Sequence, residues 1–186
     1  IFGYTGLDNL DSNFFELMKH RGPDARGIKK KSNWTLGHLR LSIIDLDSSA
    51  NQPFEKDGSI LVFNGEIYNY LELKDKYLSG DQLNTHSDTE VLISLLNKFG
   101  LDILNELNGM FAFAYLNKDQ ELYLARDRFG VKPLYYTRIS KEFYFSSEIK
   151  PLLTLRSNYN LDESIVKSYF EDTATDYDER SGYNDI

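Results

Sequence analysis

Short apolar runs separated by polar turns recur along the chain and predict a fold rich in β-strands. The runs that fit strands lie at residues 1–4, 34–39, 60–63, 110–116, 122–126, 134–137 and 143–146. Residues 117–120 and 139–141 are polar connections short enough for β-hairpin turns. Because the runs in the second half are joined this tightly, we expect an antiparallel meander there.

The run at 110–116 indicates how the sheets are covered. Phe111, Phe113 and Tyr115 point to one face of the expected strand, and Ala112 and Ala114 point to the other. Both faces are apolar, so both should be covered. The pattern therefore predicts a layered architecture, with sheet packed on sheet and helices outside.

Helical periodicity marks the segments between and after these strands. They lie at residues 10–18, 70–77, 91–99, 101–107, 147–153 and 162–170. Ser87 with Glu90 three residues later fits a capping box, and Asn69 with Glu72 fits the same kind of helix start. Gly80 and Gly100 are expected to end the helices that precede them.

The stretch FNGEIYN at residues 63–69 joins a buried strand to one of these helices. Asn64, Gly65 and Glu66 should then lie where the strand has ended and the helix has not begun. Such a junction can hold a side-chain amide, a free backbone N–H and a carboxylate in one place. The alternative is a plain strand–turn–helix connection, in which Gly65 supplies an unusual backbone angle.

Composition narrows the class of protein. A chain of 186 residues is long enough for one domain, with or without a tail, and its 41% hydrophobic residues, with 13 Tyr and 12 Phe, can fill a sizeable core. The net charge of −8 argues against nucleic acid and anionic membrane surfaces as partners. No apolar run reaches membrane-spanning length, and the first residues show no signal-peptide pattern. A cytoplasmic setting is therefore expected.

Cysteine is absent, which excludes disulfides, Cys-ligated zinc and a thiol nucleophile within residues 1–186. His20, His38 and His86 lack the spacing of metal ligands. We expect each to form hydrogen bonds or lie on the surface, and we expect no metal site.

Several dense motifs follow one another along the chain. They are RGPDARG at 21–27, RLSIID at 40–45, NGEIYN at 64–69, SDTE at 87–90, RDRFGVKPLYY at 126–136 and SSEIK at 146–150. In this order and spacing, over residues 1–153, they closely resemble the glutaminase domain of glutamine-hydrolysing asparagine synthetases. That domain is a class II, N-terminal-nucleophile glutamine amidotransferase.

The resemblance implies an α+β fold: a four-layer αββα sandwich of two antiparallel sheets, of the N-terminal-nucleophile hydrolase type. It also implies the chemistry. An N-terminal Cys attacks the side-chain amide of glutamine, and its own α-amino group, with an ordinary pKa of about 7.7–8.0, serves as the base. Ammonia leaves, and water then releases glutamate from the thioester.

The resemblance also implies roles for individual residues. The side-chain amide of Asn64 and the backbone N–H of Gly65 match the oxyanion hole. Arg40 matches the clamp for the substrate carboxylate, and Glu66 and Asp88 match the positions that serve the substrate ammonium. The pocket would be walled by Leu41, Ser42, Ile43 and Ile44.

Each charged residue also has a structural explanation. Arg40 could form a buried ion pair with a core acid. Asp88 could be favoured in the first turn of a helix by the helix dipole alone, and Glu66 could be a solvated turn residue. The residues Arg126 and Asp127 could pair across a turn, and we assign their motif no chemistry.

The resemblance sets expectations beyond residues 1–186 as well. The family has Cys-Gly directly before Ile1, which would place the nucleophile two residues ahead of Ile1. Residues 1–155 are expected to form the glutamine amidotransferase type 2 domain, and residues 156–186 a helix and linker leading to a synthetase domain. There ATP and Mg²⁺ would drive the amidation of aspartate, whereas this domain needs L-glutamine and no cofactor.

A homodimer is left open. The alternatives are another ammonia acceptor, such as a surface-polysaccharide sugar, and a catalytically inactive glutamine-binding domain.

Overall fold

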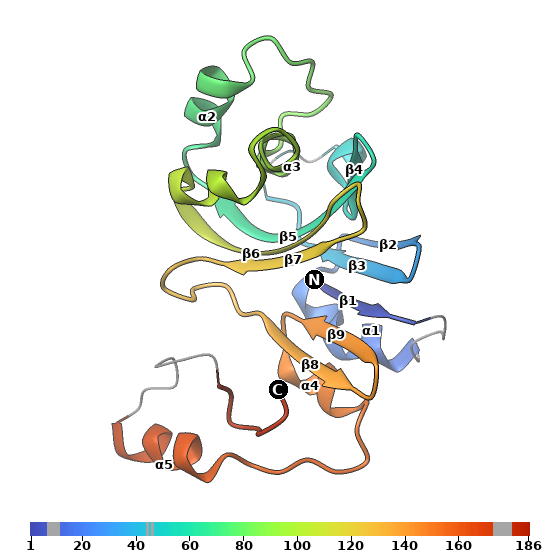
Figure 1. Ribbon diagram of the computed structural model, residues 1–186, viewed down its shortest axis with the longest axis vertical. Helices are drawn as coiled ribbons and strands as arrows, with labels where there is room; N and C mark the ends of the chain where they lie inside the picture. The colour runs from blue at the N-terminus through green and yellow to red at the C-terminus, as the bar shows by residue number, and fades with distance from the viewer. Residues whose placement is uncertain (7–11, 44, 46, 173–179) are drawn as a thin grey trace.

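The computed structural model describes residues 1–6, 12–43, 45, 47–172 and 180–186, apart from the side chains of residues 12–14 and 172. Two antiparallel sheets form its centre (Figure 1). The five-stranded sheet contains, in spatial order, β2 (Ala25–Lys31), β3 (Trp34–Arg40), β1 (Phe2–Thr5), β9 (Glu142–Ser146) and β8 (Tyr135–Ile139). The four-stranded sheet contains β4 (Phe54–Lys56), β5 (Ser59–Ile67), β6 (Gly109–Leu116) and β7 (Leu122–Arg126).

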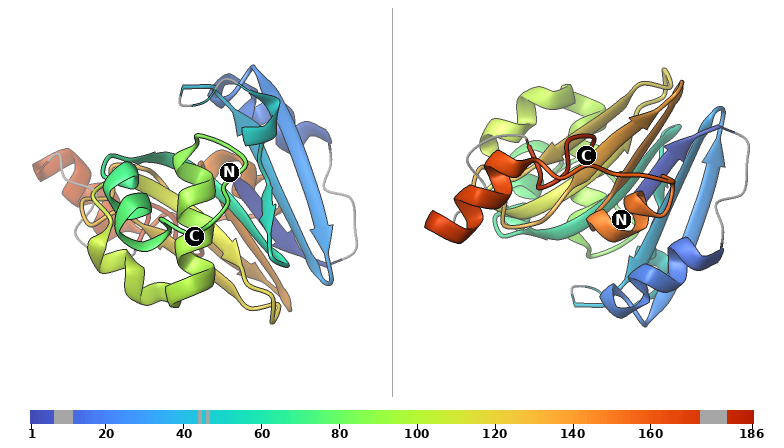
Figure 2. Two further views of the ribbon diagram at one scale, coloured as in Figure 1. Left: turned by 90° about the horizontal axis from the view of Figure 1, so that it is seen from above. Right: turned by 90° about the horizontal axis from the view of Figure 1, so that it is seen from below.

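Helices cover the outer side of each sheet (Figures 1 and 2). The four-stranded sheet is covered by α2 (Tyr70–Tyr77) and α3 (Asp88–Phe99), with a 3₁₀ helix at Gly100–Glu106. The five-stranded sheet is covered by α1 (Ser12–Met18) and α4 (Ile149–Leu153), and α5 (Glu163–Asp172) follows. The predicted four-layer α+β sandwich is confirmed.

Three apolar layers hold these four layers together. Between α3 and the four-stranded sheet, Leu92 and Leu96 pack with Phe113. Between the sheets, the core includes Ile1, Leu36, Ile60, Val62, Ala114 and Phe145. Outside the five-stranded sheet, Phe2, Met18 and Leu152 form a third cluster. The predicted coverage of β6 on both faces follows from its position between the first two of these layers.

The expected single meander is wrong. The hairpin β6–β7 belongs to the four-stranded sheet, whereas the hairpin β8–β9 belongs to the other sheet. The chain therefore crosses between the sheets within residues 127–134 (Figure 1). Local turn chemistry predicted both hairpins correctly, but only the packing of the two sheets decides which strands share a sheet.

The predicted strand–turn–helix junction at Asn64 is also wrong. Strand β5 continues through Ile67 and pairs with β6 along residues 60–67, so Asn64, Gly65 and Glu66 lie inside a strand. Asn69 precedes α2, but its side chain makes no cap hydrogen bond; it donates to the Glu106 carbonyl oxygen instead (2.9 Å). Pairing with β6 outweighs the turn preference of Asn and Gly.

Helix α3 begins with half of the expected capping box. The hydroxyl of Ser87 accepts the N–H of Glu90 (3.2 Å), as predicted. The Glu90 carboxylate does not return to the Ser87 N–H, which donates to Thr85 Oγ1 instead (3.3 Å). Ser87 is therefore the cap, and Glu90 has other partners.

The last described residues return to the five-stranded sheet. Arg156 forms an ion pair with Asp185 (3.3 Å), and the Thr137 hydroxyl donates to the Asp185 carbonyl oxygen (2.5 Å). Ile186 packs against the cluster outside that sheet. In the part of the chain that the structure describes, no helix is both long and apolar enough to cross a bilayer.

Candidate active site

One edge of β5 is left open beside Gly65. Strand β4 pairs only with residues 59–61 of β5, so the edge opposite β6 has no neighbouring strand from residue 62 onward. Phe111 lies opposite Gly65 on β6. On its far side, its N–H donates to the Asp127 carboxylate (3.1 Å) and its carbonyl oxygen accepts the Asp127 N–H (2.7 Å). Gly65 and Phe111 therefore form a non-hydrogen-bonded pair, and the N–H of Gly65 points to the open edge.

Side chains occupy this edge on both sides of Gly65. The N–H of Phe63 donates to Gln52 Oε1 (2.6 Å), and the N–H of Ile67 donates to Asp88 Oδ2 (3.1 Å). Between them, Gly65 has a φ of 152°, and an added Cβ would lie 2.1 Å from the Met110 carbonyl oxygen. Only glycine fits this place, and its N–H can act as a backbone donor.

The side chain of Asn64 points away from the plane of the sheet, whereas the N–H of Gly65 points along it to the open edge. Side chains alternate along a strand, so Asn64 shares the face of Ile60 and Val62, which pack between the two sheets. Its Nδ2 is buried and has no hydrogen-bond partner among the described residues. Buried amide donors without a partner are uncommon and call for an explanation, and a substrate oxygen is one.

Arg40 is a buried cation that forms no ion pair with the described residues. Only 6% of the residue is exposed. Its Nη1 donates to the Asp47 carbonyl oxygen (2.9 Å) and to Asn51 Oδ1 (2.7 Å), and its Nη2 donates to the Asp45 carbonyl oxygen. All three acceptors are neutral, and no carboxylate of the described residues forms an ion pair with it, so the expected alternative of a core ion pair is not found. A buried guanidinium held in this way favours an incoming carboxylate.

Asp88 provides a buried acid at the first residue of α3. Only 4% of it is exposed, and burial raises the pKa of its carboxyl to about 6, against hydrogen bonds from the Ile67 and Thr89 N–H groups. The nearby Glu66 carboxylate raises the pKa of Asp88 further. Two acids close together in a partly buried place favour a bound cation such as an ammonium.

These groups meet in one cavity of about 220 Å³. Among the predicted site residues, the cavity is lined by Arg40, Leu41, Ile43, Asn64, Gly65, Glu66 and Asp88. Ser42 does not line it; its N–H donates to Asp24 Oδ2 (2.8 Å). Ile44 lies outside the described residues. The cavity is thus formed by the end of β3, the open edge of β5 and the start of α3.

The sequence analysis missed several residues that line the same cavity. They are His38, Gln52, Thr89, Met110 and Lys132. His38 is 6% exposed, and burial lowers the pKa of its ring far below the ordinary value. Lys132 reaches the cavity because the Asp127 carboxylate accepts the N–H groups of Phe129, Val131 and Lys132 and so shapes that loop.

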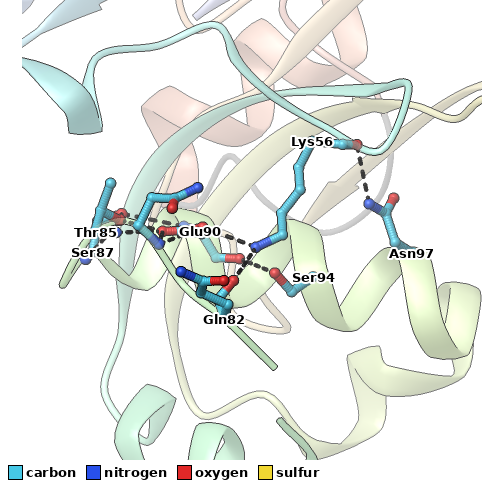
Figure 3. Close-up of polar contacts among 8 residues, drawn as sticks. Lys56, Gln82, Thr85, Ser87, Glu90, Ser94 and Asn97 are labelled. Atoms are coloured by element: carbon cyan, nitrogen blue, oxygen red, sulfur yellow. Dashed lines mark hydrogen bonds and ion pairs between the residues drawn. The ribbon is translucent and has the colours of Figure 1, made fainter. Parts of the chain in front are cut away.

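A second buried network holds the turn before α3 (Figure 3). The Glu90 carboxylate accepts the N–H groups of Asn84 (2.9 Å) and Thr85 (2.6 Å) and the Thr85 hydroxyl (2.8 Å). Lys56 on β4 forms an ion pair with it (2.8 Å). The network fixes the segment that leads into Asp88, which explains why Glu90 does not complete the capping box.

Comparison with known proteins then decides the family. The family described as the glutamine amidotransferase domain matches residues 4–186, which is nearly the whole chain. The chain belongs to the glutamine amidotransferase domain family. In the described part of this amidotransferase domain, no group of three or more His, Asp or Glu side chains could hold a metal ion.

Relatives of this amidotransferase domain are longer proteins. The chain is 42% identical over 166 residues to asparagine synthetase [glutamine-hydrolyzing] 1 of Bacillus subtilis, covering 87% of this chain and 26% of that protein. It is 43% identical over 150 residues to amidase chyE of Penicillium rubens, covering 79% of this chain and 22% of that protein. The chain thus spans about a quarter of the length of these relatives.

Solved structures agree on the fold. The structure of glutamine phosphoribosylpyrophosphate amidotransferase from Bacillus subtilis superposes with a TM-score of 0.67. The match covers 81% of this chain and 42% of that chain at 24% identity. The predicted N-terminal-nucleophile type of sandwich is therefore confirmed for the amidotransferase domain.

Proposed function

We propose that this domain binds L-glutamine in the cavity of about 220 Å³ and hydrolyses its side-chain amide to glutamate and ammonia. The observation that carries the proposal is a pair of donors at one place that have no partner among the described residues, the buried Asn64 Nδ2 and the outward N–H of Gly65. Two such donors suit an oxyanion that develops on the amide carbonyl.

The charged groups support a free amino acid as the substrate. Arg40 would hold the α-carboxylate, and Glu66 with the ionised Asp88 would hold the α-ammonium. Because these groups come from β3, β5 and α3, substrate binding joins the two sheets and the helix. The side-chain amide of glutamine then extends toward Asn64 and Gly65.

The nucleophile is proposed to be a Cys two residues ahead of Ile1. Phe2 pairs with Gly37 on β3, so a continued register would place that Cys opposite Arg40, at the cavity wall. Its thiolate attacks the amide carbonyl, and a thioester forms as the C–N bond breaks and ammonia leaves with the transferred proton. Water then cleaves the thioester to give glutamate and the free thiol.

For the whole protein we propose asparagine synthesis. The ammonia would pass to a synthetase domain that uses ATP and Mg²⁺ to amidate aspartate, in a cytoplasmic enzyme. The name of the Bacillus subtilis relative supports this acceptor. The boundary of the amidotransferase domain near residue 155 and a homodimer stay predictions.

The test uses the full-length protein with the N-terminal Cys exposed. We expect glutamate release from L-glutamine that thiol alkylation abolishes, and asparagine formation when aspartate and ATP are added. A Cys→Ala variant is the control, and it should bind glutamine without hydrolysing it. Absence of glutamate release from the folded protein would refute the hydrolysis, whereas glutamate release without asparagine would refute only the acceptor.

A further inference from the structure

His38 and Gln52 are buried polar residues whose hydrogen bonds converge on the backbone of one residue of β5, Phe63. His38 Nε2 lies 3.1 Å from the Phe63 carbonyl oxygen, and Gln52 Oε1 accepts the Phe63 N–H (2.6 Å). A ring nitrogen that faces a carbonyl oxygen must carry the proton, so His38 is the donor. Its other nitrogen, Nδ1, is buried without a partner in the described part of the chain.

Phe63 occupies the open edge of β5 immediately before the oxyanion donors. In an ordinary sheet, its N–H and C=O would bond to another strand. Here β4 has already ended, and the two side chains replace the missing strand at this residue alone. The backbone conformation at Phe63 sets where the Asn64 side chain and the next outward N–H, that of Gly65, are placed.

The side chains of His38 and Gln52 also connect the backbone of Phe63 to the other parts of the site. His38 lies two residues before Arg40 on β3 and therefore on the same face of that strand. Gln52 Nε2 donates to the Thr89 hydroxyl (3.4 Å), next to Asp88 on α3. The buried series His38, Phe63, Gln52 and Thr89 therefore connects the three elements that carry the charged and oxyanion-binding groups.

We propose that His38 and Gln52 are positioning residues, which hold the backbone of Phe63, through its C=O and its N–H, so that Asn64 and Gly65 meet the transition-state oxyanion. The proposal rests on the proposed glutamine hydrolysis. Burial lowers the pKa of His38 well below its ordinary value, so its ring stays neutral and its Nε2–H stays a donor throughout the range in which hydrolysis would be assayed.

The test compares isosteric variants in the full-length enzyme. His38→Gln keeps an amide donor within reach of the Phe63 carbonyl oxygen. The Met side chain of His38→Met has nearly the same length and shape as that Gln side chain, but it has no donor. We expect His38→Met to lower kcat about 10- to 100-fold, with KM for glutamine changed less than about threefold. Displaced donors would stabilise the transition-state oxyanion less well, whereas binding of the substrate in its ground state would be nearly unaffected. His38→Gln should stay within about threefold of the parent kcat.

Gln52→Met provides an independent second variant, since it removes the acceptor for the Phe63 N–H, and it should also lower kcat. Combining His38→Met with Asn64→Ala distinguishes positioning from general damage. If His38 acts through Asn64, the fold-decrease in kcat of the double variant is smaller than the product of the fold-decreases of the two single variants. Thermal melting and glutamine binding by calorimetry show whether each variant is folded.

Three results would overturn the proposal: an unchanged kcat in folded His38→Met and Gln52→Met, an equal loss in His38→Gln and His38→Met, or multiplicative losses in the double variant. A His38→Met protein that fails to fold leaves the decision to Gln52→Met and to the retained kcat of His38→Gln. If the parent enzyme itself releases no glutamate, the proposed function fails first, and that outcome is distinct from these.

Discussion

Asp88 is expected to lower the stability of the empty domain while it serves the substrate. Its carboxyl has a folded-state pKa of about 6, against 3.8 for an ordinary Asp. The folded state therefore binds a proton more readily than the unfolded state. The folded domain is then destabilised as pH rises from about 4 to about 6, and the full cost persists above that pH.

The size of the effect follows from the shift. About two pKa units at 1.36 kcal/mol each amount to about 3 kcal/mol at pH 7. Asp88→Asn removes the charge but keeps an oxygen for the Ile67 N–H, and it loses about 0.3–1 kcal/mol of favourable helix-dipole interaction. We therefore expect Asp88→Asn to raise the free energy of unfolding at pH 7 by about 2 kcal/mol.

Urea unfolding of parent and variant at pH 7 and pH 4 measures this difference. The gain in the free energy of unfolding of Asp88→Asn over the parent should be present at pH 7 and nearly absent at pH 4, where the parent carboxyl is protonated in the folded state. Asp75→Asn, an exposed change of the same type on α2, is the matched control and should show no such gain. A variant less stable than the parent at pH 7, or a gain that is equal at both pH values, would refute the reasoning.

The remaining predictions concern binding, catalysis and the buried network. Glutamine affinity of the parent should fall about tenfold per pH unit below pH 6, because Asp88 must ionise to hold the ammonium; calorimetry between pH 5 and 8 would show it, and a flat profile would contradict it. Arg40→Lys should weaken glutamine binding by at least about tenfold, since a Lys cannot make the paired hydrogen bonds to a carboxylate; unchanged affinity would remove Arg40 from the site. Asn64→Ala should lower kcat about 10²–10³-fold with little change in KM, and an effect on KM alone would make Asn64 a binding residue. Glu90→Gln should destabilise the domain by about 3 kcal/mol in urea unfolding, because it leaves Lys56 half-buried without its anion, and a neutral result would contradict the importance of the network.

The residues at the centre of the site could be predicted from sequence because they lie in short, dense motifs. Asn64, Gly65 and Arg40 were assigned roles on that basis, and the structure brings them to one cavity. What the sequence could not show is the reason Gly65 is available as a donor. The open edge of β5 exists because β4 is only three residues long and β6 lies on the other side, and both facts depend on strand pairing.

His38 and Gln52 were missed for a related reason. Their partners are the backbone atoms of Phe63, 25 and 11 residues away, and backbone atoms leave no signal in a sequence. The strand β2 was missed because residues 25–31 carry several Lys and Arg side chains, and only its pairing with β3 makes it a strand. One feature of the sequence points toward His38: it stands two residues before Arg40, and a strand longer by one residue than the predicted 34–39 carries both on the same face.

The electrostatics of the empty cavity also restrict the kind of glutamine that fits. Arg40 needs an anion, and the acids Glu66 and Asp88 need a cation. A ligand that carries only one of these charges would leave the opposite end of the cavity with an unpaired charge, which costs free energy. A free amino acid carries both charges on one carbon atom and satisfies both halves at once. A glutamine inside a peptide has neither charge, and it would leave a buried guanidinium and two acids uncompensated. We therefore expect these groups to select free L-glutamine over protein-bound glutamine, even though the amide to be cleaved is identical in the two.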